Sequence, residues 1–149
     1  NKTSRLYRAL IDREMAVSVA GGLQATIDPF LYEIMLTLRN DRPVEKALEI
    51  IDAEIDRIIS ERVTEEEIAR AVKQARALFA YGSENITNQA FWLGYAEMFA
   101  SYAWFENYVS RLEQVTPENL RETAAKYLRP VNRVIGYYHA ENKNGEMVE

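Results

Sequence analysis

Chemistry in this chain of 149 residues would have to come from few side chains, because it has one histidine and no cysteine. A catalytic zinc ion needs about three protein ligands, and the single His139 supplies only one of them. The helical patterns His-Glu-x-x-His and His-x-x-Glu-His are absent, as is the Gly-x-Ser-x-Gly elbow of many serine hydrolases. A Ser-His-Asp arrangement would need the same histidine. We therefore expect His139 to be a surface residue at a strand end, and this chain to hold no catalytic or metal-binding residue.

Charged side chains near predicted helix starts are weaker candidates. The run Glu65-Glu66-Glu67 could exchange protons with a substrate, but carboxylates in a first helical turn more commonly stay solvated and favour the helix dipole. Arg5 and Tyr7 lie on a predicted first helix, where packing and a surface ion pair account for them. We assign no catalytic role to these residues.

Aromatic side chains form the densest group that could recognise a ligand. Eight of them fall between Phe91 and Tyr108. Phe91, Trp92 and Tyr95 lead the group and could line a pocket for a substrate or small ligand. Apolar residues over 87–113 also recur at helical steps of three and four, and large aromatics usually build a core. We interpret this stretch as the packed centre around which the other elements assemble, and keep the three leading residues as substrate- or ligand-binding candidates.

Composition sets further bounds on function. The net charge is −5 and basic residues are spread among acidic ones, which argues against a nucleic-acid surface. No run of about 18 apolar residues occurs, so no membrane span is predicted. The start at Asn1, with neither methionine nor a signal-peptide pattern, suggests a fragment, and leaves bacterial periplasm and cytoplasm both open. We expect one domain over residues 1–140 and a polar tail over residues 141–149.

The pattern of elements predicts an α+β fold. A first helix is followed by two strands joined at Asp28-Pro29, then by four helices and a last strand. The predicted ranges are 4–14, 16–26, 30–38, 43–59, 64–79, 87–113, 116–128 and 131–139. Within the first strand, Gly21-Gly22 indicates a bulge or a close backbone approach. The order α-β-β-α-α-α-α-β places helices on one face of a small antiparallel or mixed sheet.

Three strands are few for so many amphipathic helices. We therefore expect one sheet edge or face to be completed by polypeptide outside this chain. Exposed apolar sheet surface also predicts that the isolated chain associates with itself.

Several phrases, in order and at matching intervals, resemble one family. The chain is similar to the second half of a domain from the insulinase/pitrilysin-like zinc metallopeptidases, the inverzincins, which include mitochondrial processing peptidase and bacterial two-subunit relatives. The likeness covers about residues 4–139. The phrases are Ser4-Arg5-Leu6-Tyr7-Arg8-Ala9-Leu10, Ala16-Val17-Ser18-Val19, Val63-Thr64-Glu65-Glu66-Glu67-Ile68, Val115-Thr116-Pro117-Glu118-Asn119-Leu120, Ala125-Lys126-Tyr127-Leu128 and Asn132-Arg133-Val134.

The resemblance implies a parent protein with two homologous α+β domains that enclose peptide substrates like a clamshell. Zinc and the catalytic glutamate would belong to the N-terminal domain or a partner subunit, and this chain would be the closing part of the C-terminal domain. It would supply chamber wall, a substrate-cradling surface and contacts to that N-terminal domain or a homologous subunit, with no role for nucleic acid or membrane. The alternative is a non-catalytic scaffold or assembly subunit of the same fold.

One departure from the family bears on both alternatives. Many of its C-terminal domains carry Leu-Arg-Glu-x-x-Gly-Leu-Ala-Tyr, whose Arg and Tyr assist the substrate carbonyl. The run here, Leu10 to Val17, is one residue shorter, with Ile11 at the arginine's place and Val17 at the tyrosine's. Neither can donate the hydrogen bonds of that role. The resemblance therefore implies either a parent that carries zinc before Asn1 or an inactive scaffold.

Overall fold

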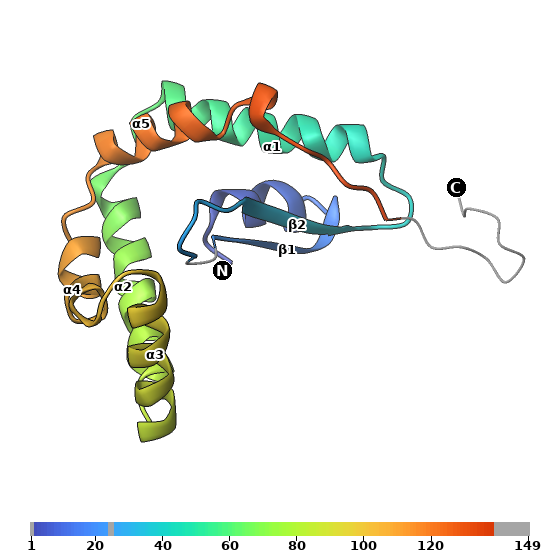
Figure 1. Ribbon diagram of the computed structural model, residues 1–149. Helices are drawn as coiled ribbons and strands as arrows, with labels where there is room; N and C mark the ends of the chain where they lie inside the picture. The colour runs from blue at the N-terminus through green and yellow to red at the C-terminus, as the bar shows by residue number, and fades with distance from the viewer. Residues whose placement is uncertain (1, 24–25, 139–149) are drawn as a thin grey trace, which may run out of the picture.

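A short helix, a β-hairpin and a long helix build the packed part of the molecule (Figure 1). The computed structural model describes residues 2–23 and 26–138. The first helix, η1 (Tyr7–Ile11), is a π-helix, and Ser4 Oγ accepts a hydrogen bond from the Tyr7 amide at its start. Strands β1 (Ala16–Leu23) and β2 (Tyr32–Leu38) pair antiparallel. The predicted hairpin is confirmed, and so is the predicted α+β fold class of the chain.

The register of the hairpin separates an inner and an outer face. On the inner face Val19 pairs with Leu36, and both side chains are half-buried. A bulge lies between Ala16 and Ser18, at the start of β1. The predicted close approach is at Gly21, where an added Cβ would lie 3.1 Å from the Tyr32 hydroxyl.

Leu10 is the centre of the core, with none of its surface exposed. It packs with Ala16 from β1 and with Ala47 and Ile51 from α1 (Val44–Ser60). Half-buried apolar side chains from the helices and the inner hairpin face surround them: Leu6, Ile11, Met15, Val19, Ile34, Leu36, Leu38, Ile50 and Ile55. The helices thus cover one face of the sheet and leave the other open.

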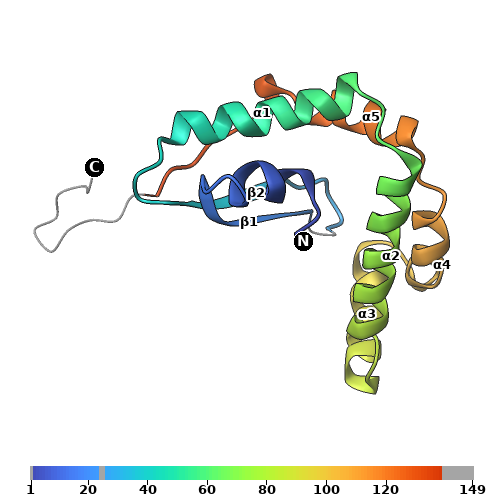
Figure 2. The same cartoon turned by 180° about the vertical axis from the view of Figure 1, so that it is seen from behind.

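Three helices leave this body as an arm, and a fourth returns (Figures 1 and 2). The arm consists of α2 (Glu65–Gly82), α3 (Ile86–Phe99) and α4 (Tyr102–Leu112), and α5 (Pro117–Tyr127) comes back to lie beside α1. Thr64 caps α2 by accepting a hydrogen bond from the Glu67 amide. At α5, Thr116 and Asn119 form a full reciprocal capping box.

The predicted single helix over 87–113 is wrong, because the chain breaks at Ala100 and Ser101. Ser101 is extended, with φ −171°, and the carboxylate of Glu97 accepts a 2.7 Å hydrogen bond from the Tyr102 amide, which gives α4 its own start. The turn lets Phe105 pack against Phe79 of α2, with ring centroids 4.9 Å apart and ring planes tilted by 41°. Nor is the aromatic stretch the centre of the fold, since α3 buries only Ala96.

The predicted last strand is also absent from the described residues. After the turn η2 (Pro130–Asn132), residues 133–138 pair with no strand, and Tyr138 is 98 % exposed. Alternating residues form a strand only where a neighbouring edge accepts their hydrogen bonds, and the described part of the chain offers none there. The segment is held instead by an ion pair between Arg133 and Asp52 of α1. His139 and the predicted tail lie outside the described residues.

Candidate functional site

The aromatic candidates Phe91, Trp92 and Tyr95 lie together on α3. The Phe91 and Tyr95 rings are stacked, with centroids 5.6 Å apart and planes 9° apart, and Trp92 meets both edge-on. The Trp92 indole donates a 3.1 Å hydrogen bond to the Gly82 carbonyl, which fastens α3 to the end of α2. Phe91 is 59 % exposed. Trp92 thus holds the arm together, and a ligand role for the trio stays a prediction.

Two open hollows lie elsewhere on the arm, and neither is lined by this trio. The larger one lies between α2 and the link from α4 to α5, where Arg76 forms a 2.8 Å ion pair with Glu113. Its apolar lining is formed by Ile68, Ala69, Val72, Val115 and Pro117. The other follows α4 past Trp104 and Asn107. Both are shallow surfaces rather than enclosed pockets.

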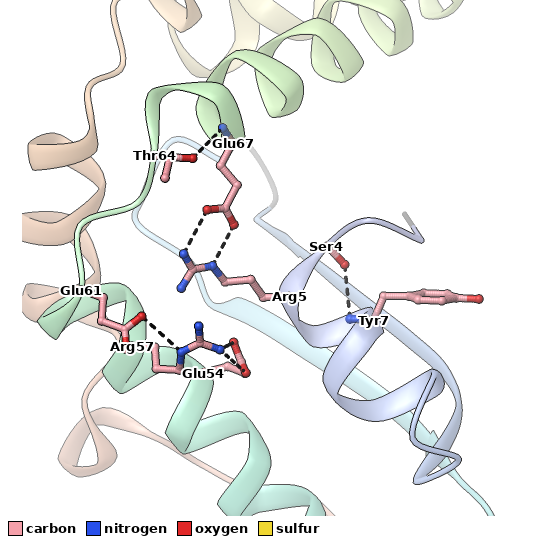
Figure 3. Close-up of polar contacts among 8 residues, drawn as sticks. All are labelled: Ser4, Arg5, Tyr7, Glu54, Arg57, Glu61, Thr64 and Glu67. Atoms are coloured by element: carbon pink, nitrogen blue, oxygen red, sulfur yellow. Dashed lines mark hydrogen bonds and ion pairs between the residues drawn. The ribbon is translucent and has the colours of Figure 1, made fainter.

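A network of ion pairs joins the body to the arm (Figure 3). Arg5 lies two residues before η1 and donates two hydrogen bonds to Glu67 in the first turn of α2. They run from Nε to Oε1 at 2.8 Å and from Nη2 to Oε2 at 3.0 Å. The hydrogen bonds raise the pKa of Arg5 and lower the pKa of Glu67. Arg57 of α1 bridges Glu54 and Glu61 beside them. The predicted ion pair of Arg5 is confirmed, and its partner is 62 residues away.

The network explains why α2 has only half of a capping box, although Thr64 and Glu67 have the residue types and spacing for a full one. Thr64 accepts the Glu67 amide, but the Glu67 carboxylate turns to Arg5 instead of back to the Thr64 amide (Figure 3). Tyr7 points away from Arg5 in the same view. These contacts position elements and contain no group set up for proton transfer.

The positions that carry Arg and Tyr in the resembling family are structural here. Ile11 packs against the core around Leu10, and Val17 is exposed beside the bulge of β1. Neither hydrocarbon side chain can donate a hydrogen bond to a substrate carbonyl.

The donor set of the described residues does not fit a zinc ion. Nowhere in residues 2–23 and 26–138 do three His, Cys, Asp or Glu side chains gather closely enough to hold a metal. The only histidine of the sequence is His139, outside these ranges. We derive no catalytic step through a metal in this chain.

The outer face of the hairpin is an open surface, and the sequence predicted an open sheet edge or face without assigning residues to it. Its paired positions are Ser18 with Thr37, Ala20 with Met35 and Gly22 with Glu33, all of them exposed. The β1 row is made of small residues, and a Cβ added at Gly22 meets nothing within 4 Å. In the described part of the chain the sheet has two strands, so each keeps one edge without a strand partner. Such an edge can accept an extended peptide through main-chain hydrogen bonds. Small side chains gave no signal for this in the sequence.

No helix among the described residues has the length and apolar character needed to cross a membrane.

Comparison with known proteins gives one family and several similar folds. The Peptidase M16 inactive domain family matches residues 1–75, which span η1, the hairpin, α1 and the start of α2. A candidate zinc protease of Bordetella pertussis Tohama I is 23 % identical, with a TM-score of 0.77 over 90 % of this chain and 74 % of that one. The inactive peptidase domain of a candidate zinc protease of Bordetella parapertussis is 24 % identical, with a TM-score of 0.81 over 91 % of this chain and 74 % of that one. A protease of Helicobacter pylori is 15 % identical, with a TM-score of 0.80 over 89 % of this chain and 32 % of that one. Among curated proteins, no sequence matches significantly.

Proposed function

Because this chain belongs to the Peptidase M16 inactive domain family, we propose that it is a non-catalytic part of a zinc-dependent endopeptidase. It contributes chamber wall, a surface on which peptide substrates lie, and contact with the N-terminal domain of the same parent chain or with a homologous subunit. The observation that carries the proposal is the family match over residues 1–75, the part of the chain with the Leu10 core and the open hairpin face.

The hairpin supports the substrate-cradling part of this proposal. The outer face of β1 carries only the small residues Ser18, Ala20 and Gly22, which leave free space above it. An extended chain can therefore approach the backbone closely. Main-chain hydrogen bonds to a strand edge give affinity with little dependence on the peptide's sequence. That property suits a wall which must hold many peptides while another unit cuts them.

Zinc belongs, in this proposal, to the N-terminal domain or the partner subunit. When bound there, the metal activates a water molecule that attacks the peptide bond. Residues of this chain hold and orient the peptide, and none of them ligates the metal.

A second candidate function, a non-catalytic scaffold or assembly subunit, is favoured by Ile11 and Val17. Both occupy positions at which many C-terminal domains of the resembling family carry hydrogen-bond donors, and both are hydrocarbons here. A wholly inactive parent would have no use for those donors.

The experiment compares the whole parent protein with a version that lacks residues 1–149. We expect the intact parent to bind zinc and to cleave a quenched fluorescent peptide, and the deletion to abolish cleavage while bound zinc, measured by atomic absorption, is unchanged. Loss of zinc with the deletion would place metal ligands in this chain and refute the proposal. An intact parent with neither zinc nor cleavage, both alone and together with its partner subunit, would favour the scaffold. Chelator-sensitive proteolysis by the isolated chain would refute both.

A further inference from the structure

The side of α3 that faces away from the rest of the arm is an exposed apolar strip. We call it the outer α3 face and define it as Ile86, Ala90, Phe91, Gly94 and Met98, which fall on one side of the helix at 3.6 residues per turn. Ile86 is 82 % exposed and Met98 is 70 % exposed. A helix whose apolar residues run all round it is normally covered on every side. In both views α3 lies far from the hairpin, so completion of the sheet does not cover it (Figures 1 and 2).

Gly94 makes the middle of this face flat. A Cβ built there meets nothing within 4 Å, so no contact inside the described chain requires a glycine. In a helix interior, glycine is less favourable than alanine. Glycine at an exposed helical position that has room for a side chain fits a surface on which another chain comes close to the backbone.

The charges in the stretch of sequence that contains the face are of one sign. From residue 77 to residue 110 the sequence has no Lys, Arg or His, and its charged residues are Glu84, Glu97 and Glu106. Helices that lie on lipid normally carry Lys and Arg on their polar side, and anionic headgroups would repel this one. Two copies packed through the same face about a two-fold axis would bring the glutamates of each copy near those of the other.

We propose that the outer α3 face is a docking surface for another protein segment with an apolar centre and a rim of Lys and Arg. This inference rests on the proposed function, since the partner is the other domain or subunit of the peptidase. The apolar strip supplies buried area, Gly94 allows the partner's backbone to approach, and the glutamates select a basic partner.

The test uses the 149-residue chain and two synthetic helical peptides of equal length and leucine content. One carries Lys on its polar face and the other Glu. In a Trp104→Phe background, Trp92 is the only tryptophan, and it contacts Phe91 of the outer α3 face, so its fluorescence reports binding there. Gly94→Gln places a polar side chain in the middle of the face, and Gly136→Gln is the matched control, because an added Cβ meets nothing within 4 Å at either position. Ile86→Gln is the second blocking variant.

The expected result is that the Leu/Lys peptide binds at least about tenfold more tightly than the Leu/Glu peptide. Gly94→Gln and Ile86→Gln should weaken that binding about tenfold without changing the far-ultraviolet circular dichroism, while Gly136→Gln leaves it unchanged. Equal affinity for the two peptides, no binding of either, or binding that both blocking variants leave intact would overturn the proposal. Tighter binding to phosphatidylcholine or phosphatidylglycerol vesicles would assign the face to lipid. Association of the chain with itself that Gly94→Gln abolishes would assign it to a second copy.

Failure of the proposed function is a separate outcome. It is read from zinc content and peptide cleavage in the parent protein, neither of which enters the peptide-binding measurement. Suppose that the 149-residue chain binds neither peptide, while the parent protein loses cleavage but keeps zinc when residues 1–149 are deleted. That combination would refute the docking surface alone.

Discussion

Arg5 and Glu67 are joined by two parallel hydrogen bonds across 62 residues of sequence, and they tie the start of the body to the start of the arm. Both side chains are less than one-third exposed. The pair therefore keeps more of its attraction than a fully solvated one, although water still screens part of it. Since α2 begins at this joint, the pair also sets where the arm leaves α1 (Figure 3).

We predict that Glu67→Gln and Arg5→Gln each lower the free energy of unfolding by about 1 kcal/mol, and that the double variant costs less than the sum, because the two groups share one interaction. Urea unfolding of the two single variants and the double variant measures this coupling. Glu118→Gln, which breaks the exposed pair with Arg121 within α5, is the control and should change little. Additive losses would mean that the pair contributes nothing of its own.

The same pair predicts a dependence of stability on pH. The pKa of Glu67 is lowered from its ordinary 4.5 by the hydrogen bonds from Arg5. Its contribution is therefore fully present above pH 4.5 and is lost as the pH falls through the lower, folded pKa. Between neutral pH and about pH 3, the free energy of unfolding should fall less for Glu67→Gln than for the unsubstituted chain. An equal fall in the free energy of unfolding for both proteins would contradict this role of the Arg5–Glu67 pair.

We predict that Leu10→Ala lowers stability by about 2–5 kcal/mol, because it opens a cavity at the one large side chain that is fully buried among the described residues. Phe91→Ala should cost less than about 1 kcal/mol, since that ring is mostly exposed. Thermal unfolding of the two variants compares how much the Leu10 core and the aromatic stretch each stabilise the fold. A larger loss from Phe91→Ala would restore the aromatic stretch as the centre of the fold.

The sequence placed the elements better than it placed the core. Alternation and the Asp28-Pro29 turn predicted the hairpin, and the apolar stripe predicted α1, because both depend on local periodicity. The break at Ser101 was hidden, because the apolar steps of three and four continue through it. What ends the helix is a capping contact from Glu97, which no periodicity reveals. The large aromatics were assigned to the core by size alone, but burial depends on which distant segments arrive, and those gathered around Leu10.

For the functional residues too, some features could be predicted from the sequence and others could not. The family resemblance drawn from short phrases is confirmed, because those phrases are helix caps and core contacts that follow from the fold. The partner of Arg5 could not be found, since no local pattern links it to Glu67. The small residues of β1 were missed because an open face is marked by what its side chains lack.

We predict that Glu14→Gly raises the free energy of unfolding by about 1 kcal/mol. Glu14 links η1 to β1 with φ 57°, a left-handed conformation that glycine adopts without the clash of a Cβ. The hydrogen bond that its carbonyl accepts from Arg42 is a backbone contact and survives the change. Chemical denaturation measures the gain, and Glu14→Val should lower stability instead.

We predict that Gly22→Gln raises the KM of the parent protein for peptides several-fold with little change in kcat, because a side chain on the outer hairpin face obstructs binding and touches no reacting group. Steady-state kinetics with a fluorescent peptide measures the split. Gly136→Gln is the matched control, because an added Cβ meets nothing within 4 Å there either. A fall in kcat at constant KM would contradict a purely cradling role.

We predict that the isolated chain associates with itself through the open hairpin, and that Met35→Lys weakens this association. Met35 lies on the outer face of β2 and is 68 % exposed, and a lysine beside a strand edge opposes pairing with another sheet. Met98→Lys is the matched control, because Met98 is almost equally exposed but lies on α3. Sedimentation velocity over a range of concentrations should show a smaller fraction of oligomer for Met35→Lys and no change for Met98→Lys. If Met98→Lys alone gives monomer, the contact between copies runs through the arm, and the docking surface on α3 must be reassigned to a second copy of the chain.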